Sequence, residues 1–446
     1  MKPLLALAAL ALAFAPAAAA DAKLSSAEKK MIQVVDREQD RTLALLEKLV
    51  NENSGTLNFA GVEAVGRMMR AELEPLGFEV RWVSISEAKR AGHIVASHKG
   101  NGRGKRMLLI GHLDTVFEPD SPFQRFVRKS ADTAEGPGVG DDKGGIAVMV
   151  AALRAMQGAG TLKNADIEIV LTGDEEDAGS PIEVSRRDLI AAAGRTDVAL
   201  DFENLSTENG KDMGAIARRG SAEWELRTTG RPGHSSRIFS DVSGNGAIYE
   251  LTRILAAFRQ ELPEPNLTFN VGLVVGGTAA TLDATGTRGE ASGKTNIIPE
   301  IAIARGDIRT LSLEQYSRVT AKMREIASRH LPGAKAELTL FEGAYPPMAP
   351  TPANQALLDR LNVVNRDLGL EAMQPIDPLK RGAGDIGFVA HLLPGLVGLG
   401  PAGGGAHAPG ETVDIPSMAR QTKRAAILMT RLSREKRATA PRATLR

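Results

Sequence analysis

The sequence predicts an α/β fold that is interrupted by a smaller α+β domain. In the first and last parts of the chain, short apolar runs alternate with helical patterns, as in a sheet that helices cover on both faces. Between residues 214 and 343 the expected order is strand-helix-strand-strand-helix-strand, which is the pattern of a ferredoxin-like sandwich. The length of 446 residues also favours two domains over one.

Each element is expected from its own apolar pattern, beginning with a helix capped by Ser26. In the larger domain we expect helices 26–50 and 60–76, strands 79–83 and 106–110, helix 145–156, strands 167–172, 198–202 and 396–399, and helix 417–434. In the inserted domain we expect strand 215–229, helix 245–262, strands 267–275 and 297–309, helix 313–331 and strand 335–341.

These elements place the larger domain at residues 21–213 and 344–435, and the inserted domain at residues 214–343. Residues 1–20 have the three parts of a secretory signal peptide: a positive start, an apolar run too short to span a bilayer, and small residues before a cut after about Ala20. We therefore expect a periplasmic or secreted protein. Residues 436–446 are basic and are expected to form a flexible tail.

The composition excludes several kinds of function. With 55 Lys and Arg residues against 54 Asp and Glu, the net charge is +1, so no overall field favours nucleic acid or an anionic membrane surface. The chain has no cysteine and therefore no thiol nucleophile, thiolate metal ligand or disulfide redox pair. A bound metal must be held by histidines and carboxylates.

Polar motifs stand at the C-terminal ends of expected strands, where open α/β sheets bind ligands. His112 and Asp114 project to the same side of an extended backbone, so Asp114 could orient a metal-bound His112. The alternative is a structural histidine beside a turn aspartate. Asp141 and Asp142 lie in a glycine-rich segment that opens a helix, where paired carboxylates can hold or bridge dications. The alternative there is a helix cap.

Three more candidates follow later strands. Glu175 and Glu176 point in different directions, so one can bind metal while the other acts as a base; the alternative is a solvated acidic loop. Glu203 and His407 are weak indications individually, because such residues are common at strand ends and in glycine loops. Together, two histidines and several carboxylates at the ends of one sheet fit a metal site with oxygen and nitrogen ligands. Zinc suits these ligands, and a shared carboxylate suits a two-metal hydrolase.

The order of these motifs resembles a known enzyme family. The segments are GHLDT at 111–115, GPGVGDDKGG at 136–145, TGDEE at 172–176, FE at 202–203 and HAPGETVD at 407–414. They resemble the zinc exopeptidase family of glutamate carboxypeptidase, aminoacylase and succinyl-diaminopimelate desuccinylase, and most of all its secreted bacterial glutamate carboxypeptidases. The likeness extends over nearly all of the mature chain. It implies a zinc-exopeptidase catalytic domain, with a mixed sheet flanked by helices, and an inserted ferredoxin-like lid that also mediates dimerisation.

The resemblance implies a role for each motif residue. Asp141 would bridge two zinc ions per subunit, for which cobalt or manganese could substitute, and would be joined to Asp142 by a cis peptide bond. Glu175 would be the general base, and Asp114 would orient one ligand. The implied ligands are His112 and Glu203 on one ion, Glu176 and His407 on the other, and Asp141 on both.

Other residues would bind the substrate. In the family, the loop that matches the one containing His234 reaches the active site of the partner subunit, which implies a homodimer. Asn296 and Gly382 resemble segments that line the substrate pocket. The turn that leaves the inserted domain lacks the arginine with which many relatives bind the substrate carboxylate, so Arg309 or Arg381 is expected to take that role.

The expected function is cleavage of an amide or peptide bond beside a free carboxylate in a short peptide or small acyl-amino acid, with release of a C-terminal amino acid such as glutamate. Two alternatives remain. One is an aminoacylase or desuccinylase that acts on N-acyl amino acids with the same ligands. The other is a peptide-binding homologue without activity.

Overall fold

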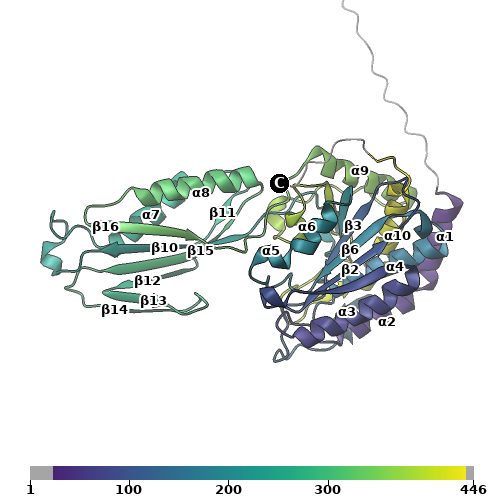
Figure 1. Ribbon diagram of the computed structural model, residues 1–446, viewed down its shortest axis with the longest axis horizontal. Helices are drawn as coiled ribbons and strands as arrows, with labels where there is room; N and C mark the ends of the chain where they lie inside the picture. Colours follow the sequence, from purple (N-terminus) through teal and green to yellow (C-terminus); the bar gives the residue numbers. More distant parts are fainter. Residues whose placement is uncertain (1–23, 438–446) are drawn as a thin grey trace, which may run out of the picture.

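The computed structural model of the chain describes residues 24–437. The expected signal peptide and most of the expected tail lie outside the described residues. A larger α/β part and a smaller part built on its own antiparallel sheet lie side by side (Figure 1). Between residues 24 and 437, no helix has both the length and the apolar character needed to cross a membrane.

The larger part is built on a six-stranded sheet in the order β1-β2-β6-β3-β7-β17. Neighbours among β6, β3, β7 and β17 are parallel, whereas β2 is antiparallel to β6 and β1 is antiparallel to β2. The strands are β1 (Glu79–Ser84), β2 (Gly92–His98), β3 (Met107–His112), β6 (Ile167–Thr172), β7 (Val198–Asp201) and β17 (Gly395–Val397). The expected α/β class with a mixed sheet is confirmed, although β2 is absent from the expected elements.

Helices cover both faces of this sheet (Figure 1). They are α1 (Ser26–Arg37), α2 (Gln39–Val50), α3 (Phe59–Leu73), α4 (Lys143–Gly158), α5 (Ile182–Ser185), α6 (Arg187–Ala193), α9 (Pro352–Asp367) and α10 (Ile415–Leu432). Alternate residues of β3 point to opposite faces, so Met107 and Leu109 join one buried apolar cluster while Leu108 and Ile110 join another. Helix α4 packs against α1, α2 and α10 within the first cluster.

The predicted helix over residues 26–50 is in fact two helices, and its cap is Ser25 rather than Ser26. The backbone N–H of Glu28 donates to Ser25 Oγ at 3.3 Å, and that of Ser25 donates to Glu28 Oε2 at 2.7 Å. This reciprocal pair of bonds is a capping box. Helix α1 ends at Glu38, where φ is −102° and ψ is 15°, and α2 begins at the next residue. Neither glycine nor proline marks the break, so the sequence pattern gives no sign of it.

The smaller part is a sheet in the order β11-β15-β10-β16, with β12 also paired to β15 and with α7 and α8 packed on it. Its elements are β10 (Ala222–Gly230), α7 (Ala247–Glu261), β11 (Thr268–Phe269), β12 (Leu273–Gly277), the hairpin β13 (Ala279–Leu282) and β14 (Gly289–Ser292), β15 (Ile301–Arg309), α8 (Leu313–Ser328) and β16 (Ala334–Leu340). The antiparallel order and the two helices are those of a ferredoxin-like sandwich.

Short strands complete the larger part. One small sheet contains β4 (Val127–Arg128), β5 (Thr133–Glu135), β18 (Gly403–Gly404) and β19 (Thr412–Asp414), and a hairpin contains β8 (Ser206–Glu208) and β9 (Lys211–Met213). The pairing of β19 with β5 brings the C-terminal glycine-rich loop close to the loop that precedes α4.

Candidate active site

The candidate site lies at the carboxyl ends of β3, β6 and β7. These strands are parallel, with His112 opposite Thr172 and Ile110 opposite Asp201. Their ends therefore meet at one edge of the sheet, and so do the motif residues that follow them. The loop that precedes α4 and the loop between β18 and β19 reach the same edge, as the contacts of Asp141 show.

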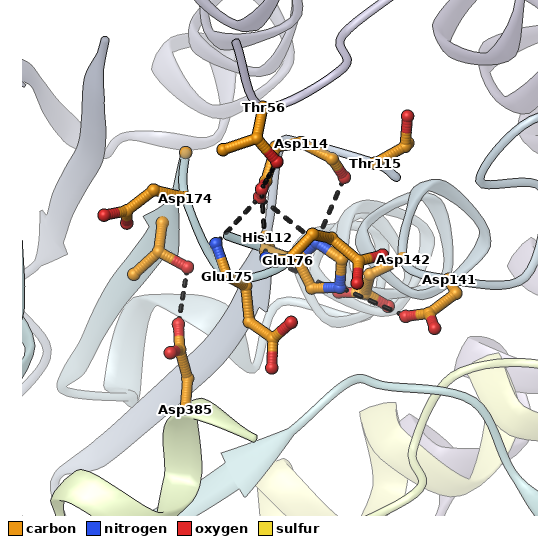
Figure 2. A network of polar contacts seen from close by, with 12 residues as sticks. Thr56, His112, Asp114, Thr115, Asp141, Asp142, Asp174, Glu175, Glu176 and Asp385 are labelled. Carbon is orange, nitrogen blue, oxygen red and sulfur yellow. Dashed lines mark hydrogen bonds and ion pairs between the residues drawn. The ribbon is translucent and has the colours of Figure 1, made fainter. Parts of the chain in front are cut away.

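Asp141 lies at the centre of the cluster. Its Oδ1 is 3.1 Å from His112 Nε2, and its Oδ2 is 3.3 Å from His407 Nε2, which also lies 3.0 Å from Glu176 Oε2. Ligand atoms of His112, Asp141 and Glu176 all lie within 4.8 Å of one another, as in a metal site. Figure 2 shows the ring of His112 directed toward Asp141. The peptide bond from Asp141 to Asp142 is cis, as the resemblance implies.

The charges of this cluster fit a cation. Burial opposes ionisation of Asp141, but the hydrogen bonds with His112 and His407 outweigh it and hold the pKa of Asp141 below its usual value. Hydrogen bonds with Asp141 and Glu176 raise the pKa of His407 to about 11. Burial lowers the pKa of His112, but its hydrogen bonds with Asp114 and Asp141 outweigh burial and raise it, so both rings favour the charged form beside the buried carboxylates. Metal ions can take over this charge once the rings lose their protons.

Glu411 holds the loop that carries Asp141. Its carboxylate accepts hydrogen bonds from the backbone N–H groups of Gly138 at 3.0 Å, Gly140 at 2.8 Å and Asp141 at 3.0 Å. Gly138 has a φ of +68°, a conformation that side chains disfavour. Glu411 follows His407 by four residues, so one C-terminal loop supplies both a candidate ligand and the support for another.

Asp114 organises the segment that follows β6. Its carboxylate accepts hydrogen bonds from Thr56 Oγ1 at 2.6 Å and from the backbone N–H groups of Glu175 at 3.0 Å and Glu176 at 3.1 Å (Figure 2). His112 Nδ1 lies 3.1 Å from the main-chain oxygen of Asp114 and 3.4 Å from its Oδ1. The main-chain carbonyl is therefore the nearer partner of the ring, and the carboxylate chiefly fixes the backbone of the two glutamates.

Glu175 stands beside the cluster, with its side chain extending away from Asp114 (Figure 2). Burial raises the pKa of Glu175 well above its usual value, and burial likewise raises the pKa of Glu176 to about 7. A carboxyl group with a raised pKa can accept a proton and return it near neutral pH. Glu175 thus has the properties that a general base needs.

Glu203 is the predicted ligand that the structure pairs with arginines. Its Oε1 lies 2.5 Å from Arg218 Nη1, and its Oε2 lies 3.4 Å from Arg381 Nη2. Arg218 is itself fixed, because its Nε donates to the carbonyl oxygen of Gly382 at 2.8 Å. Burial is the main cause that raises the pKa of Glu175, and the charge of Glu203 adds to it. No local motif indicates the pairing of Glu203 with Arg218.

The two arginines expected to bind a substrate carboxylate differ in their surroundings. Arg381 is buried beside Glu203, and its Nε makes no hydrogen bond within residues 24–437. Arg309 is more exposed and donates from Nε to Asp307 at 3.0 Å. A Cβ atom added to Gly382 would lie 4.0 Å from Arg309 Nη1, so Arg309 also approaches this segment.

His234 and Asn296 lie on the smaller part, apart from the cluster. Both are exposed, and the backbone N–H of Ser235 donates to the carbonyl oxygen of Asn296 at 2.9 Å. The ring of His234 has Ser236 Oγ at 2.8 Å from its Nδ1. Within the part of the chain that the structure describes, neither residue forms a hydrogen bond or an ion pair with the carboxylate cluster.

A buried network that the sequence did not indicate lies behind the segment after β6. Arg186 Nη1 is 2.7 Å from Asp174 Oδ1, and its Nε is 2.7 Å from Asp385 Oδ1. Its Nη2 donates to Tyr345 Oη at 2.8 Å. The four residues come from separate segments, so no local motif could reveal the network.

Comparisons with known proteins identify the family. The sequence pattern of Peptidase family M20/M25/M40 matches residues 108–431. Carboxypeptidase G2 from a Pseudomonas species is 28% identical over 439 residues, which are 96% of this chain and 98% of that protein. A succinyl-diaminopimelate desuccinylase from Leptothrix cholodnii is 32% identical over 201 residues, which are 43% of this chain and 51% of that protein. The structure of a tripeptidase from Staphylococcus aureus shares the fold, with a TM-score of 0.70 and 19% identity over 89% of this chain and 99% of that one.

The family match spans most of the chain and includes the segments that carry all five candidate ligands. The structure of a dinuclear metal binding peptidase of the M20 family from Bacillus subtilis shares the fold, with a TM-score of 0.62 and 17% identity over 89% of this chain and 98% of that one. The group formed by His112, Asp141 and Glu176 in this chain agrees with metal-dependent hydrolysis. The chain therefore belongs to peptidase family M20/M25/M40, and it is a metal-dependent hydrolase of peptide or amide bonds.

Proposed function

We propose that this enzyme uses two zinc ions to cleave the amide bond beside a free carboxylate, releasing a C-terminal amino acid such as glutamate from a short peptide or N-acyl amino acid. The observation that carries the proposal is the position of Asp141, which presents one carboxylate oxygen to His112 and the other to His407. A carboxylate in this position, with an imidazole beside each oxygen, would be suited to hold two ions between the two histidines.

The remaining ligands divide between the ions. We assign Glu203 to the ion that His112 binds and Glu176 to the ion that His407 binds. In Glu203 the less tightly held oxygen is Oε2, 3.4 Å from Arg381, and this oxygen is the one available to a metal. Imidazole and carboxylate ligands suit zinc, and they also accept cobalt or manganese. When bound, the ions polarise the amide carbonyl and lower the pKa of a water molecule.

Glu175 moves the proton in this proposal. It takes a proton from the attacking water and returns it to the departing amine, as a general base and then a general acid. The raised pKa of its buried carboxyl group supports both steps. Its backbone N–H is anchored by Asp114, so the same aspartate that contacts His112 also fixes the base.

Arg381 binds the substrate carboxylate in this proposal. It is preferred to Arg309 because it is buried at the site and has an unpaired Nε, whereas Arg309 is occupied by Asp307. An open pocket of about 400 Å³ adjoins Glu176 and is lined by Ile182 and by residues 176–180, 221–223 and 341–345 from both parts of the chain.

The second candidate function is that of an aminoacylase or desuccinylase. The likeness to a desuccinylase supports it, and the likeness to carboxypeptidase G2 over 96% of the chain favours the first candidate. A peptide-binding protein without activity is the third candidate. The presence of Glu175 together with the candidate ligands argues against it, because an unused site is free to lose them.

A substrate panel tests the proposal. The zinc-loaded enzyme is assayed on dipeptides with C-terminal glutamate, folate-like glutamate conjugates, N-acyl amino acids and succinyl-diaminopimelate, beside the Glu175→Ala variant. We expect the glutamate compounds to be hydrolysed and Glu175→Ala to keep its metal but lose about 10²–10⁴-fold in kcat. Glu183→Ala, which removes an exposed glutamate of α5, is the matched control. Near-normal turnover by Glu175→Ala would refute the assignment of the base.

We also propose a homodimer formed through the smaller part, in which His234 completes the site of the partner. Its exposed position and three exposed apolar residues, Phe239, Val242 and Tyr249 at 63%, 75% and 52%, support this arrangement. Mixing inactive His234→Ala and Glu175→Ala subunits should restore activity, because each mixed dimer regains one complete site. Absence of recovery in a protein that light scattering shows to be monomeric would contradict the proposal.

Export is proposed as well, and a mature N-terminus near Asp21 in periplasmic or culture fractions would support it.

A further inference from the structure

Tyr345 lies in one of the two segments that join the smaller part to the larger part. These segments pair with each other: Ser221 and Tyr345 exchange backbone hydrogen bonds of 2.9 and 2.8 Å, and Arg218 and Met348 exchange two of 2.9 Å. The ring of Tyr345 packs against that of Phe388, with 5.2 Å between centroids. Tyr345 is therefore a fixed member of the connection between the two parts.

The hydroxyl of Tyr345 bonds to the backbone of Glu175. It donates to the carbonyl oxygen of Glu175 at 2.6 Å, while the N–H of Glu175 donates to Asp114 Oδ1 at 3.0 Å. Within the described residues the carboxylate of Glu175 makes no hydrogen bond of its own. The direction in which this side chain leaves the backbone thus depends on the two backbone anchors.

Arg186 ensures that the hydroxyl points toward Glu175. Its Nη2 donates to Tyr345 Oη at 2.8 Å, and a guanidinium group cannot accept a hydrogen bond. The single proton of the hydroxyl is therefore left for the carbonyl of Glu175. Arg186 is in turn fixed between Asp174 and Asp385, both at 2.7 Å.

We propose that Tyr345 is a positioning residue for Glu175: its hydroxyl holds the backbone of the base so that the carboxylate faces the reacting amide. The inference rests on the role proposed for Glu175. A displacement of about 1 Å in a reacting group can cost about 100-fold in rate. Loss of one of two anchors should therefore lower kcat about 10- to 100-fold, and it should leave KM within about twofold because the base is not a binding group.

The Tyr345→Phe variant tests this inference, because it removes one oxygen and keeps the ring against Phe388. Tyr316→Phe is the matched control, since the hydroxyl of Tyr316, in helix α8 of the smaller part, has no hydrogen-bond partner within residues 24–437. For wild type and both variants, kcat, KM, metal content and melting temperature are measured. We expect a lower kcat for Tyr345→Phe alone, with KM and metal content unchanged.

A double-mutant cycle shows whether Tyr345 acts through the base. In the Glu175→Ala background, Tyr345→Phe should cause no further loss of the residual rate. The inference is overturned if Tyr345→Phe matches wild type, if its loss is a rise in KM, if it loses metal, or if its effect persists without Glu175. Near-normal turnover by Glu175→Ala alone would instead overturn the proposed function, so the two failures are distinguishable.

Discussion

Replacing Arg186 by Met would remove a buried cation from between two carboxylates. The side chains of Arg186, Asp174 and Asp385 are 1%, 0% and 3% exposed, and both nitrogen-oxygen distances are 2.7 Å. Removing one partner of a buried ion pair costs about 3–5 kcal/mol, because the other charge is left uncompensated. Since two carboxylates lose the same partner, we expect the free energy of unfolding to fall by about 5 kcal/mol, at the upper end of that range.

Urea unfolding of wild type and variant at neutral pH measures this loss. Arg187→Met is the control, because the side chain of Arg187 is 56% exposed and lies 3.8 Å from Asp188. We expect this variant to change the free energy of unfolding by no more than about 0.5 kcal/mol. Burial raises the pKa of Asp385 even beside Arg186, and removal of the cation raises it further. When the pKa of a carboxyl group is higher in the folded than in the unfolded protein, the protein loses stability as pH rises. The difference in unfolding free energy between wild type and Arg186→Met should therefore shrink as pH falls from about 7 toward 4. A deficit below about 1 kcal/mol would show that Asp174 and Asp385 do not depend on the charge of Arg186.

Three further predictions concern the site. In steady-state kinetics, Arg381→Ala should raise KM about 10-fold or more for substrates with a free carboxylate but not for the corresponding amides. An equal rise in KM for both kinds of substrate, or the same rise from Arg309→Ala, would contradict this role. Because the pKa of His407 is raised to about 11, a metal ion must displace the proton of this ring, so the apparent metal affinity should fall as pH falls. Calorimetry in two buffers with different ionisation enthalpies should detect the released proton. Metal binding without proton release would contradict the assignment of His407 as a ligand. Glu411→Gln should weaken metal affinity about 10-fold in chelator competition, because the backbone N–H groups of Gly138, Gly140 and Asp141 lose the carboxylate that accepts their hydrogen bonds. An unchanged affinity would show that Glu411 does not support the loop that carries Asp141.

The parts of the site that lie in local motifs could be predicted from the sequence. His112, Asp141 and Glu176 each lie at a strand end or helix start that an apolar run announces, and parallel strands bring such ends together. The ferredoxin-like order of the smaller part could likewise be predicted, because β10, β15, β16 and the two helices are long and periodic. The expected strand 267–275 is instead divided into the short strands β11 and β12.

The supports of the site could not be predicted, because their partners are distant in sequence. Arg186 reaches Tyr345 and Asp385, and an arginine pair such as Arg186-Arg187 normally indicates a solvated surface. The pairing of Arg218 with Glu203 likewise joins a segment between the two parts to the residues that follow β7. Helix α9 was missed although Thr351 caps it and Pro352 opens it, which is a local pattern typical of a helix start.

Anomalous diffraction from a zinc-loaded crystal would locate each ion without reference to activity. We expect two peaks, one near Asp141 Oδ1 and His112 and the other near Asp141 Oδ2 and His407. A single peak, or two peaks of which neither lies within bonding distance of Asp141, would contradict this expectation.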